Sequence, residues 1–117
     1  MDKYIKQFPK EASFKQDGFD GFNCNLECEN ISITLEDVYK GHEKYAMNTK
    51  SYHIYYVTKG SGTFKIDRNM YDVKEGDIIE VPPNTEFIFK GKMKLLLIMN
   101  PPFDEKNDVT GKENDIY

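Results

Sequence analysis

Two side chains in the segment Tyr52–Thr58 are suited to acid–base chemistry. His53 and Tyr55 are two residues apart, so on an extended strand they point to the same face. An imidazole titrates near neutral pH and can act as a general base, and a nearby phenol can act as the acid. The sequence therefore predicts His53 and Tyr55 as a catalytic pair. A hydrogen-bonded core histidine is the alternative interpretation of His53.

The cysteines and histidines are too few for a disulfide framework or a zinc site. The chain has two histidines, His42 and His53, and two cysteines, Cys24 and Cys28. On a strand, the Cα atoms of residues four apart are separated by about 13 Å, whereas a disulfide requires them within about 7 Å. A zinc site would need further ligands at suitable spacing. We therefore expect two reduced thiols, as in a reducing compartment.

Size and charge limit the classes of function. The 117 residues suffice for one domain, and the net charge of −4 disfavours a general nucleic-acid or anionic-membrane binder. The sequence has no apolar run long enough to span a membrane, and its first residues lack the apolar segment of a signal peptide. We therefore expect a cytoplasmic protein that binds neither nucleic acid nor membrane.

Residue composition predicts an all-β fold. Ten Ile, five Val, six Thr, eight Tyr and eight Phe stand against two Ala and five Leu. The expected strands include residues 22–28, 31–39, 52–58, 63–67, 70–73, 78–81, 86–89 and 93–99. The glycine-containing segments 59–62 and 90–92 are predicted to be turns. Short strands at this spacing are typical of a sandwich or small barrel.

The spacing of the turn residues resembles that of a known family. The first set is Gly41, Met47, Thr49, His53 and Gly60, and the second set is Gly76, Pro82, Asn84, Phe87 and Gly91. Both sets fit the two sequence motifs of the cupin family, and the chain resembles cupins over residues 41–103. The resemblance implies a cupin-type jelly-roll β-barrel, also called a double-stranded β-helix, in a single domain.

The pattern of residues along the chain divides it into three parts. Residues 1–21 are expected to form an N-terminal lead-in or edge strand, and residues 22–103 the cupin barrel. Residues 104–117 are polar and acidic without periodicity, and we expect a loosely ordered C-terminal tail there.

The positions that bind metal in many cupins are substituted. The resemblance implies that three histidines and a glutamate would converge on one divalent ion. In this chain those positions hold Met47, Thr49, His53 and Phe87. One imidazole and one thioether make a poor site for such an ion, and a phenylalanine cannot act as a ligand. We therefore expect no metal and no other cofactor.

The cupin resemblance implies that the face carrying His53, Tyr55 and Val57 points into the barrel. The predicted ligand pocket around the catalytic pair comprises Tyr45, Met47, Thr49, Phe64, Ile79, Phe87 and Phe89. Small-molecule pockets commonly have such an aromatic and apolar lining. The alternative is that these side chains fill a narrow barrel.

Three functions follow from this lining. The first is a module that binds a small organic or sugar-like ligand. The second is a metal-independent sugar or nucleotide-sugar isomerase or epimerase, with His53 as base and Tyr55 or Tyr45 as acid. A diphosphate substrate would need cations, and the chain offers one arginine, Arg68, and lysines such as Lys90. The third is a structural or interaction protein with a filled barrel.

The segment Leu95–Met99 is apolar at every position. A strand of this kind is covered on both faces. We therefore expect a homodimer in which a second copy covers the outer face. An intrachain cover formed by residues 1–20 is the alternative.

Overall fold

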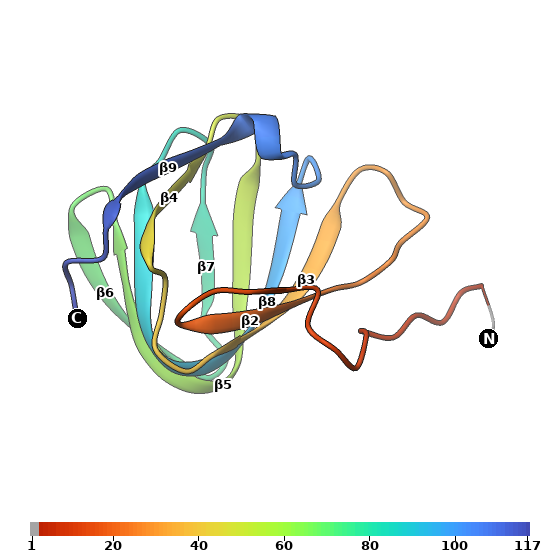
Figure 1. The fold of residues 1–117 in the computed structure, drawn as a ribbon, viewed down its shortest axis with the longest axis horizontal. Helices are drawn as coiled ribbons and strands as arrows, with labels where there is room; N and C mark the ends of the chain where they lie inside the picture. The colour runs from red at the N-terminus through yellow and green to blue at the C-terminus, as the bar shows by residue number, and fades with distance from the viewer. Residues whose placement is uncertain (1–2) are drawn as a thin grey trace.

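The computed structural model describes residues 3–117, which form an antiparallel sheet curled into a barrel (Figure 1). The strands are β1 (Phe14–Lys15), β2 (Phe19–Asn23), β3 (Ser32–Val38), β4 (Lys44–Asn48), β5 (Tyr52–Ile66), β6 (Asn69–Lys74), β7 (Ile78–Val81), β8 (Phe87–Asn100) and β9 (Asp108–Glu113), with one 3-10 turn, η1 (Glu105–Asn107). The predicted all-β barrel is confirmed. Within these residues no helix is long and apolar enough to cross a membrane.

The sheet is organised around β8. One path through the sheet runs β1-β2-β3-β8-β4-β9, while β5 pairs with β6, β7 and β8. β8 therefore contacts β3, β4 and β5, and the side chains of all these strands can meet inside one barrel.

β5 and β8 are the longest strands and pair along their whole length. The predicted turns at 59–62 and 90–92 are wrong, because these segments are bends within the two strands. Gly62 and Gly91 face each other across the pair, and a Cβ on Gly91 would lie 2.5 Å from the Cα of Gly62. With no side chains between them, the two backbones bend together and the sheet curls.

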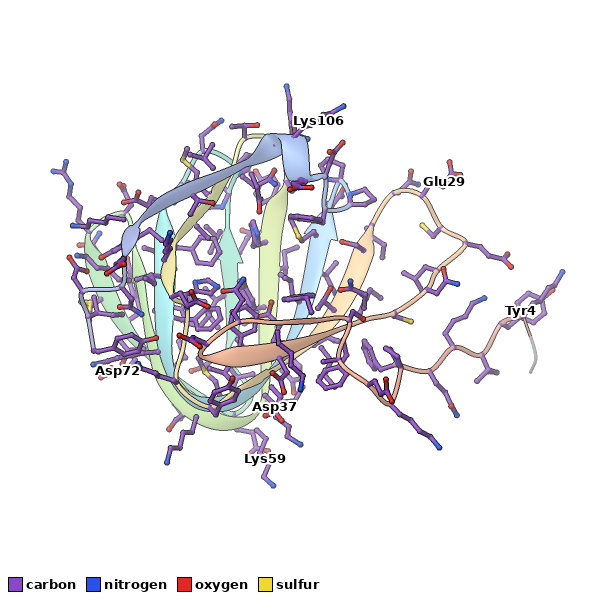
Figure 2. All side chains as sticks on the ribbon, viewed as in Figure 1. Tyr4, Glu29, Asp37, Lys59, Asp72 and Lys106 are labelled. Carbon is purple, nitrogen blue, oxygen red and sulfur yellow. The ribbon has the colours of Figure 1, made fainter. Side chains whose placement is uncertain are left out.

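The barrel interior holds an aromatic and aliphatic core, and Figure 2 shows its rings between the strands while labelled residues such as Lys59 and Asp72 point outward. The buried cluster comprises Phe19, Val38, Tyr55, Val57, Phe64, Val73, Ile79, Val81, Phe87, Phe89, Met93, Leu95, Leu97 and Met99. Its rings meet edge to face, as Tyr55 and Phe64 do with centroids 5.3 Å apart.

β3 turns its polar side chains toward this interior. Thr34, Glu36 and Val38 are buried, whereas Leu35 is half-buried and Asp37 is exposed. The alternation predicted for residues 31–39 is therefore present. Its inward face is the one with a threonine and a glutamate, which brings a carboxyl group inside the barrel.

The alternating segment 22–28 is not a single strand. β2 ends at Asn23, and the N–H of Cys24 still donates to the carbonyl of Ile33 at 2.9 Å. β3 begins at Ser32, so the residues after Cys24 have no strand opposite them and form a loop. Cys24 precedes this loop and Cys28 lies in it, and both are free thiols.

The segment 104–117 differs from the loosely ordered tail expected from its composition. It contains η1 and β9, and β9 pairs with β4. Most β9 side chains are exposed, so the strand is held by backbone pairing and its polar sequence carries no inward periodicity. Figure 1 shows β9 lying beside β4 across one side of the barrel.

Asn48 joins β4 to β9. Its side chain is 2% exposed, and its Oδ1 accepts the N–H groups of Lys50 at 3.0 Å and Ser51 at 2.7 Å. Its Nδ2 donates to Asp108 Oδ1 at 2.9 Å. A single side chain thus shapes the β4–β5 turn and holds Asp108 in place.

Replacement of Asn48 by alanine is expected to lower the free energy of unfolding by about 2–4 kcal/mol, because it leaves two backbone donors and a carboxylate without their partner. Urea denaturation followed by circular dichroism measures the change. Asn69→Ala is the matched control, since Asn69 is exposed and makes one long hydrogen bond of 3.5 Å. Equal stability of the Asn48 variant and the wild type would contradict this account.

Candidate active site

A partly open cavity of about 580 Å³ is lined by barrel strands together with residues of the N-terminal segment and of the segment after β8. Its apolar walls include Phe14, Phe19, Ala46, Phe87, Leu97, Met99 and Phe103. Its polar and titratable lining includes Asn23, Ser32, Thr34, Glu36, His42, His53, Tyr55 and Asp108. Among residues 3–117, no lysine or arginine lines the cavity. Apolar surfaces with a few converging polar groups are typical of small-molecule sites.

His42 is held at the cavity by the segment between β3 and β4. Gly41 approaches β8 so closely that a Cβ there would lie 2.3 Å from the carbonyl oxygen of Phe89. This approach lets the N–H of His42 donate to the same oxygen at 3.0 Å. The imidazole is 6% exposed and lies against the Phe89 ring, with centroids 3.7 Å apart.

The His42 ring is neutral and incompletely paired. Burial, with a smaller contribution from His53, lowers its pKa to about 3. Its Nδ1 is buried and has no hydrogen-bond partner in the part of the chain that the structure describes. A buried polar atom without a partner is costly, so it marks a position where a bound molecule would supply a contact.

His53 and Tyr55 come from β5 and face the same cavity, as their spacing predicts. Their rings are stacked with centroids 6.1 Å apart, and His53 also meets the edge of Phe87 at 5.0 Å. Burial lowers the pKa of His53 to about 4. Burial, followed by the carboxyl groups of Glu36 and Asp108, raises the pKa of Tyr55.

Glu36 places a neutral carboxyl group in this cavity. The residue is 4% exposed, and burial raises its pKa to about 8. Its Oε1 has no hydrogen-bond partner among residues 3–117. At neutral pH this group is a carboxylic acid that can donate a proton, and the lining of the same cavity holds two histidines that can accept one.

The residues at the cupin ligand positions do not fit a divalent metal ion. Among the described residues, no group of three or more His, Cys, Asp or Glu side chains could hold such an ion. The Phe87 ring lies 5.0 Å from the His53 ring, where a metal ligand would be needed. The donor set therefore suits proton transfer better than metal binding.

The structure separates the predicted pocket residues into two groups. Phe87 lines the cavity together with His53 and Tyr55. Six others lie outside its lining: Tyr45, Met47, Thr49, Phe64, Ile79 and Phe89. Direct ligand contact by any of these residues stays a prediction.

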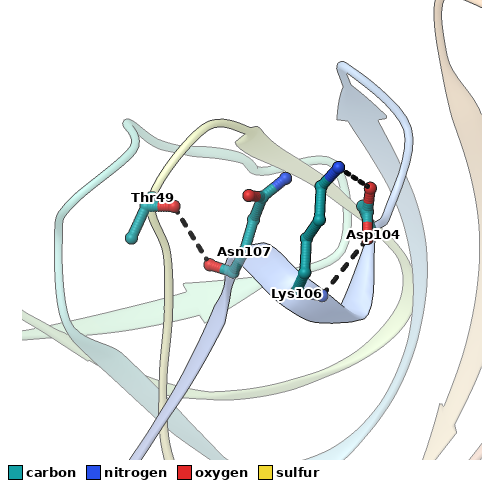
Figure 3. Close-up of polar contacts among 4 residues, drawn as sticks. All are labelled: Thr49, Asp104, Lys106 and Asn107. Atoms are coloured by element: carbon teal, nitrogen blue, oxygen red, sulfur yellow. Dashed lines mark hydrogen bonds and ion pairs between the residues drawn. The ribbon is translucent and has the colours of Figure 1, made fainter.

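These six side chains have other partners in the fold. Phe64, Ile79 and Phe89 belong to the buried core, and Met47 lies in the β4–β9 pair. The other two face the C-terminal segment. Tyr45 Oη donates to Asp115, and Thr49 Oγ1 donates to the carbonyl of Asn107 at 3.3 Å beside η1 (Figure 3).

Sequence reasoning missed His42, Glu36 and Asp108 as cavity residues. His42 lies just after Gly41, a glycine of the first motif, and that neighbourhood was the available signal. Glu36 occupies the polar face of a strand whose apolar face gave the stronger pattern. Asp108 lies in the segment expected to be a loose tail, so no pattern pointed to it.

Comparisons with known proteins agree with the barrel fold and with a ligand-binding domain. The family described as "AraC-like ligand binding domain" matches residues 33–89. An uncharacterized protein of Methanocaldococcus jannaschii is 34% identical over 61 residues, covering 49% of each chain. This chain thus spans about half the length of that relative.

Two kinds of solved structure resemble the barrel. Pac13, described as a unique nucleoside dehydratase, has a TM-score of 0.82 at 25% identity, covering 92% of this chain and 86% of that one. A Streptomyces Pac13 variant solved with uridine has a TM-score of 0.84 at 25% identity, covering 92% and 91%. The cupin domain of Schizosaccharomyces pombe Cnp3 has a TM-score of 0.64 at 15% identity, covering 75% and 69%, and shows the fold alone.

The buried groups give the stability of this protein a distinct pH profile. Between its unfolded pKa of 4.5 and its folded pKa of about 8, Glu36 keeps its proton in the folded state and loses it in the unfolded state, so stability falls as the pH rises through this window. The two histidines have the opposite effect. In the unfolded state their imidazoles take up protons below pH 6.5, whereas in the folded state His42 stays neutral down to a pH of about 3 and His53 down to about 4. Stability therefore falls as the pH drops below 6.5.

Stability is therefore expected to be greatest near pH 6.5, the unfolded pKa of the histidines. Between pH 6.5 and 8 the wild type should lose about 2 kcal/mol, and Glu36→Gln should abolish this loss. Urea denaturation at a series of pH values measures both profiles. Glu80→Gln, at an exposed glutamate of β7, should retain the wild-type decline. A wild-type stability that stays constant over this range would contradict the burial of a neutral Glu36.

Proposed function

This chain belongs to the cupin superfamily, and from that premise we propose that its cavity binds a small uncharged molecule of the nucleoside or sugar class and performs acid–base chemistry on it. The proposal depends on one observation. Two buried atoms on the lining of one cavity, Nδ1 of His42 and Oε1 of Glu36, have no hydrogen-bond partner among the described residues. One is a base in its neutral form and the other an acid in its neutral form at pH 7. The similarity to a nucleoside dehydratase supports the proposed substrate class.

The reaction this pair suits best is an elimination of water. A neutral imidazole is a weak base, so the C–H bond it attacks must lie beside a carbonyl group that stabilises the resulting carbanion. His42 takes this proton, the electron pair forms a carbon–carbon double bond, and the hydroxyl group on the next carbon leaves with the proton of Glu36 as water. A proton passing from the imidazolium to the carboxylate restores the starting state.

In this proposal His53 and Tyr55 bind the substrate and do not act as the base and the acid. His53 lies close enough to His42 for its charge to affect the pKa of His42. The Tyr55 hydroxyl is protonated at neutral pH, and its raised pKa keeps it so in the cavity, where it can donate a hydrogen bond. These two residues, first predicted as base and acid, are proposed to bind the substrate hydroxyl and carbonyl oxygens next to the reacting bond.

The charge of the cavity favours an unphosphorylated ligand. Its lining carries Glu36 and Asp108 and no lysine or arginine. A phosphate or diphosphate group would enter without a cation to pair it, which is costly in a buried site. Lys90 and Lys92 line a separate groove on the outside of the barrel. This distribution disfavours the nucleotide-sugar epimerase and leaves a sugar isomerase as the related alternative.

A ligand sensor without chemistry is the second candidate. The match to a ligand-binding domain family over residues 33–89 favours it. A sensor and an enzyme would both use the cavity, but a sensor would leave the ligand unchanged. The cavity of about 580 Å³ favours either of them over the third alternative, a structural protein with a filled barrel.

The outer face of the sheet supports a homodimer as part of the same proposal. The outer apolar face is defined here as six apolar side chains on the outward side of β3, β5, β7 and β8. They are Leu35, Ile54, Tyr56, Ile78, Leu96 and Ile98. Within it, Tyr56 lies opposite both Leu96 and Ile78 in register. Ile78 is 69% exposed and Tyr56 is 42% exposed. An apolar row this continuous is characteristic of an interface.

We also propose that the protein is cytoplasmic. The free thiols of Cys24 and Cys28 support a reducing compartment.

Uridine is expected to bind at least about tenfold more tightly than uridine 5′-monophosphate, because the monophosphate brings charge into a cavity without cations. Isothermal titration calorimetry with the two ligands measures the ratio. His42→Phe keeps an aromatic ring against Phe89 and removes the proposed base, so it should retain the fold and lose turnover. Tighter binding of the monophosphate, or no binding of either ligand, would contradict the proposed ligand class.

Turnover distinguishes the enzyme from the sensor. Nucleosides or sugars that carry a carbonyl beside a C–H bond are incubated with the protein in D₂O and followed by NMR. The proposal expects deuterium at that carbon or loss of the neighbouring hydroxyl with the wild type and neither with His42→Phe. Binding without either change would favour the sensor.

The homodimer predicts that Leu96→Glu yields a monomer, because the charge would be buried in the interface. Light scattering after size-exclusion chromatography measures the mass. Val109→Glu, at a 44% exposed position on β9 outside the outer apolar face, should leave the dimer intact. A wild-type mass equal to that of one chain would contradict the dimer.

A further inference from the structure

The segment Asn114–Tyr117, here called the clamp, follows β9 and contacts the backbone that carries His42. Two of its side chains donate to one acceptor, the carbonyl oxygen of His42. Asn114 Nδ2 lies 2.9 Å from that oxygen, and Tyr117 Oη also lies 2.9 Å from it. Residues more than 70 positions apart in the sequence therefore meet at the proposed base.

The clamp also holds what lies beside His42. Asn114 Nδ2 reaches the carbonyl of Phe89 at 3.4 Å, and the N–H of Asn114 donates to the carbonyl of Glu43 at 2.8 Å. Phe89 carries the ring against which the imidazole lies. Asn114 thus links the His42 peptide to the strand that supports its ring, so its contacts constrain the ring's position as well as the loop's.

The clamp is also held by contacts with residues other than His42. The N–H of Ile116 donates to Asn114 Oδ1 at 2.9 Å, which fixes the amide so that its Nδ2 points at the two carbonyls. Asp115 accepts from Tyr45 Oη and pairs with Lys112 Nζ at 3.1 Å. Lys40 Nζ lies over the Tyr117 ring, 4.7 Å from its centroid.

His42 needs such a device because it lies between two strands rather than within one. Its own backbone N–H makes one bond, to Phe89, and its Nδ1 makes none among the described residues. A base must be held within a few tenths of an ångström of its working position to be effective. The loop is tied to β8 by the His42–Phe89 bond and by the N–H of Gly91, which donates to the carbonyl of Lys40 at 2.9 Å. The clamp adds the two contacts on the carbonyl oxygen of His42 itself.

We propose that Asn114 and Tyr117 are positioning residues that fix the His42 imidazole at the cavity, so that the C-terminal strand and the clamp form part of the active site. The inference rests on the proposed role of His42 as the base. It extends that role to a segment which touches neither the cavity nor the ligand, since neither residue belongs to the cavity lining.

The test uses full-length protein with ¹⁵N-labelled histidine. Long-range ¹H–¹⁵N spectra report which nitrogen of each neutral ring carries the proton and whether the ring has one environment. The wild type is expected to show one sharp set of His42 signals. Tyr117→Phe should shift that set, and the double variant Asn114→Ala/Tyr117→Phe should broaden or split it, while the His53 signals stay in place.

Tyr39→Phe is the matched control. Tyr39 is a similarly exposed tyrosine, at 50% against 53% for Tyr117, and its hydroxyl donates to the carbonyl of Gln16 rather than to that of His42. It should leave the His42 signals unchanged. Thermal unfolding of every variant shows whether a spectral change reflects local repositioning or a general loss of structure.

The outcomes separate this inference from the proposed function. His42 signals identical to those of the wild type in the double variant would overturn the positioning role, whatever ligand binds. If the signals change but no nucleoside or sugar is turned over, the positioning role stands and the proposed function fails. Where turnover is found, the double variant should lower kcat about tenfold with a smaller effect on KM.

Discussion

Burial of ionisable groups among aromatic rings is the constraint on which the rest of this structure depends. His42, His53 and Glu36 are each less than 8% exposed, and each is driven toward its uncharged form by the loss of water. The result is an acid and two bases that coexist without forming ion pairs with one another. Such groups can exchange protons with a substrate. Groups held in ion pairs with one another would stabilise the protein and would be poor proton donors and acceptors.

The framework that maintains this environment comes from backbone geometry rather than from many polar contacts. Gly62 and Gly91 let β5 and β8 bend together and close the barrel around the cavity. Gly41 lets the His42 segment approach β8. β9 pairs with β4, and the bond between Asn48 and Asp108 brings one of its residues to the cavity lining. Gly41 places His42 and Asn48 places Asp108, so the fold and the site share these two supports.

The sequence predicted the parts of this structure that depend on periodicity and turn spacing. Composition and alternation gave the all-β barrel, and the spacing of His53 and Tyr55 gave their common face. Other features depend on long-range contacts that no local pattern records. The bends at Gly62 and Gly91 resemble turns until the two strands are seen to pair with each other. Glu36 lies inside because β3 turns its apolar face, with Leu35, to the outside of the barrel. Asp108 reaches the cavity lining because β9 pairs with β4.

The central claim is that a protonated Glu36 and a neutral His42 lie on the lining of one cavity at neutral pH. The most direct measurement is a pH titration followed by NMR, with ¹³C-labelled glutamate carboxyl groups and ¹⁵N-labelled histidine and with Glu36→Gln and His42→Phe to assign the signals. The Glu36 carboxyl is expected to stay protonated up to a pH of about 8, and the His42 ring is expected to stay neutral down to a pH of about 3. A Glu36 signal that titrates near pH 4.5 together with a His42 signal that titrates near pH 6.5 would contradict the central claim.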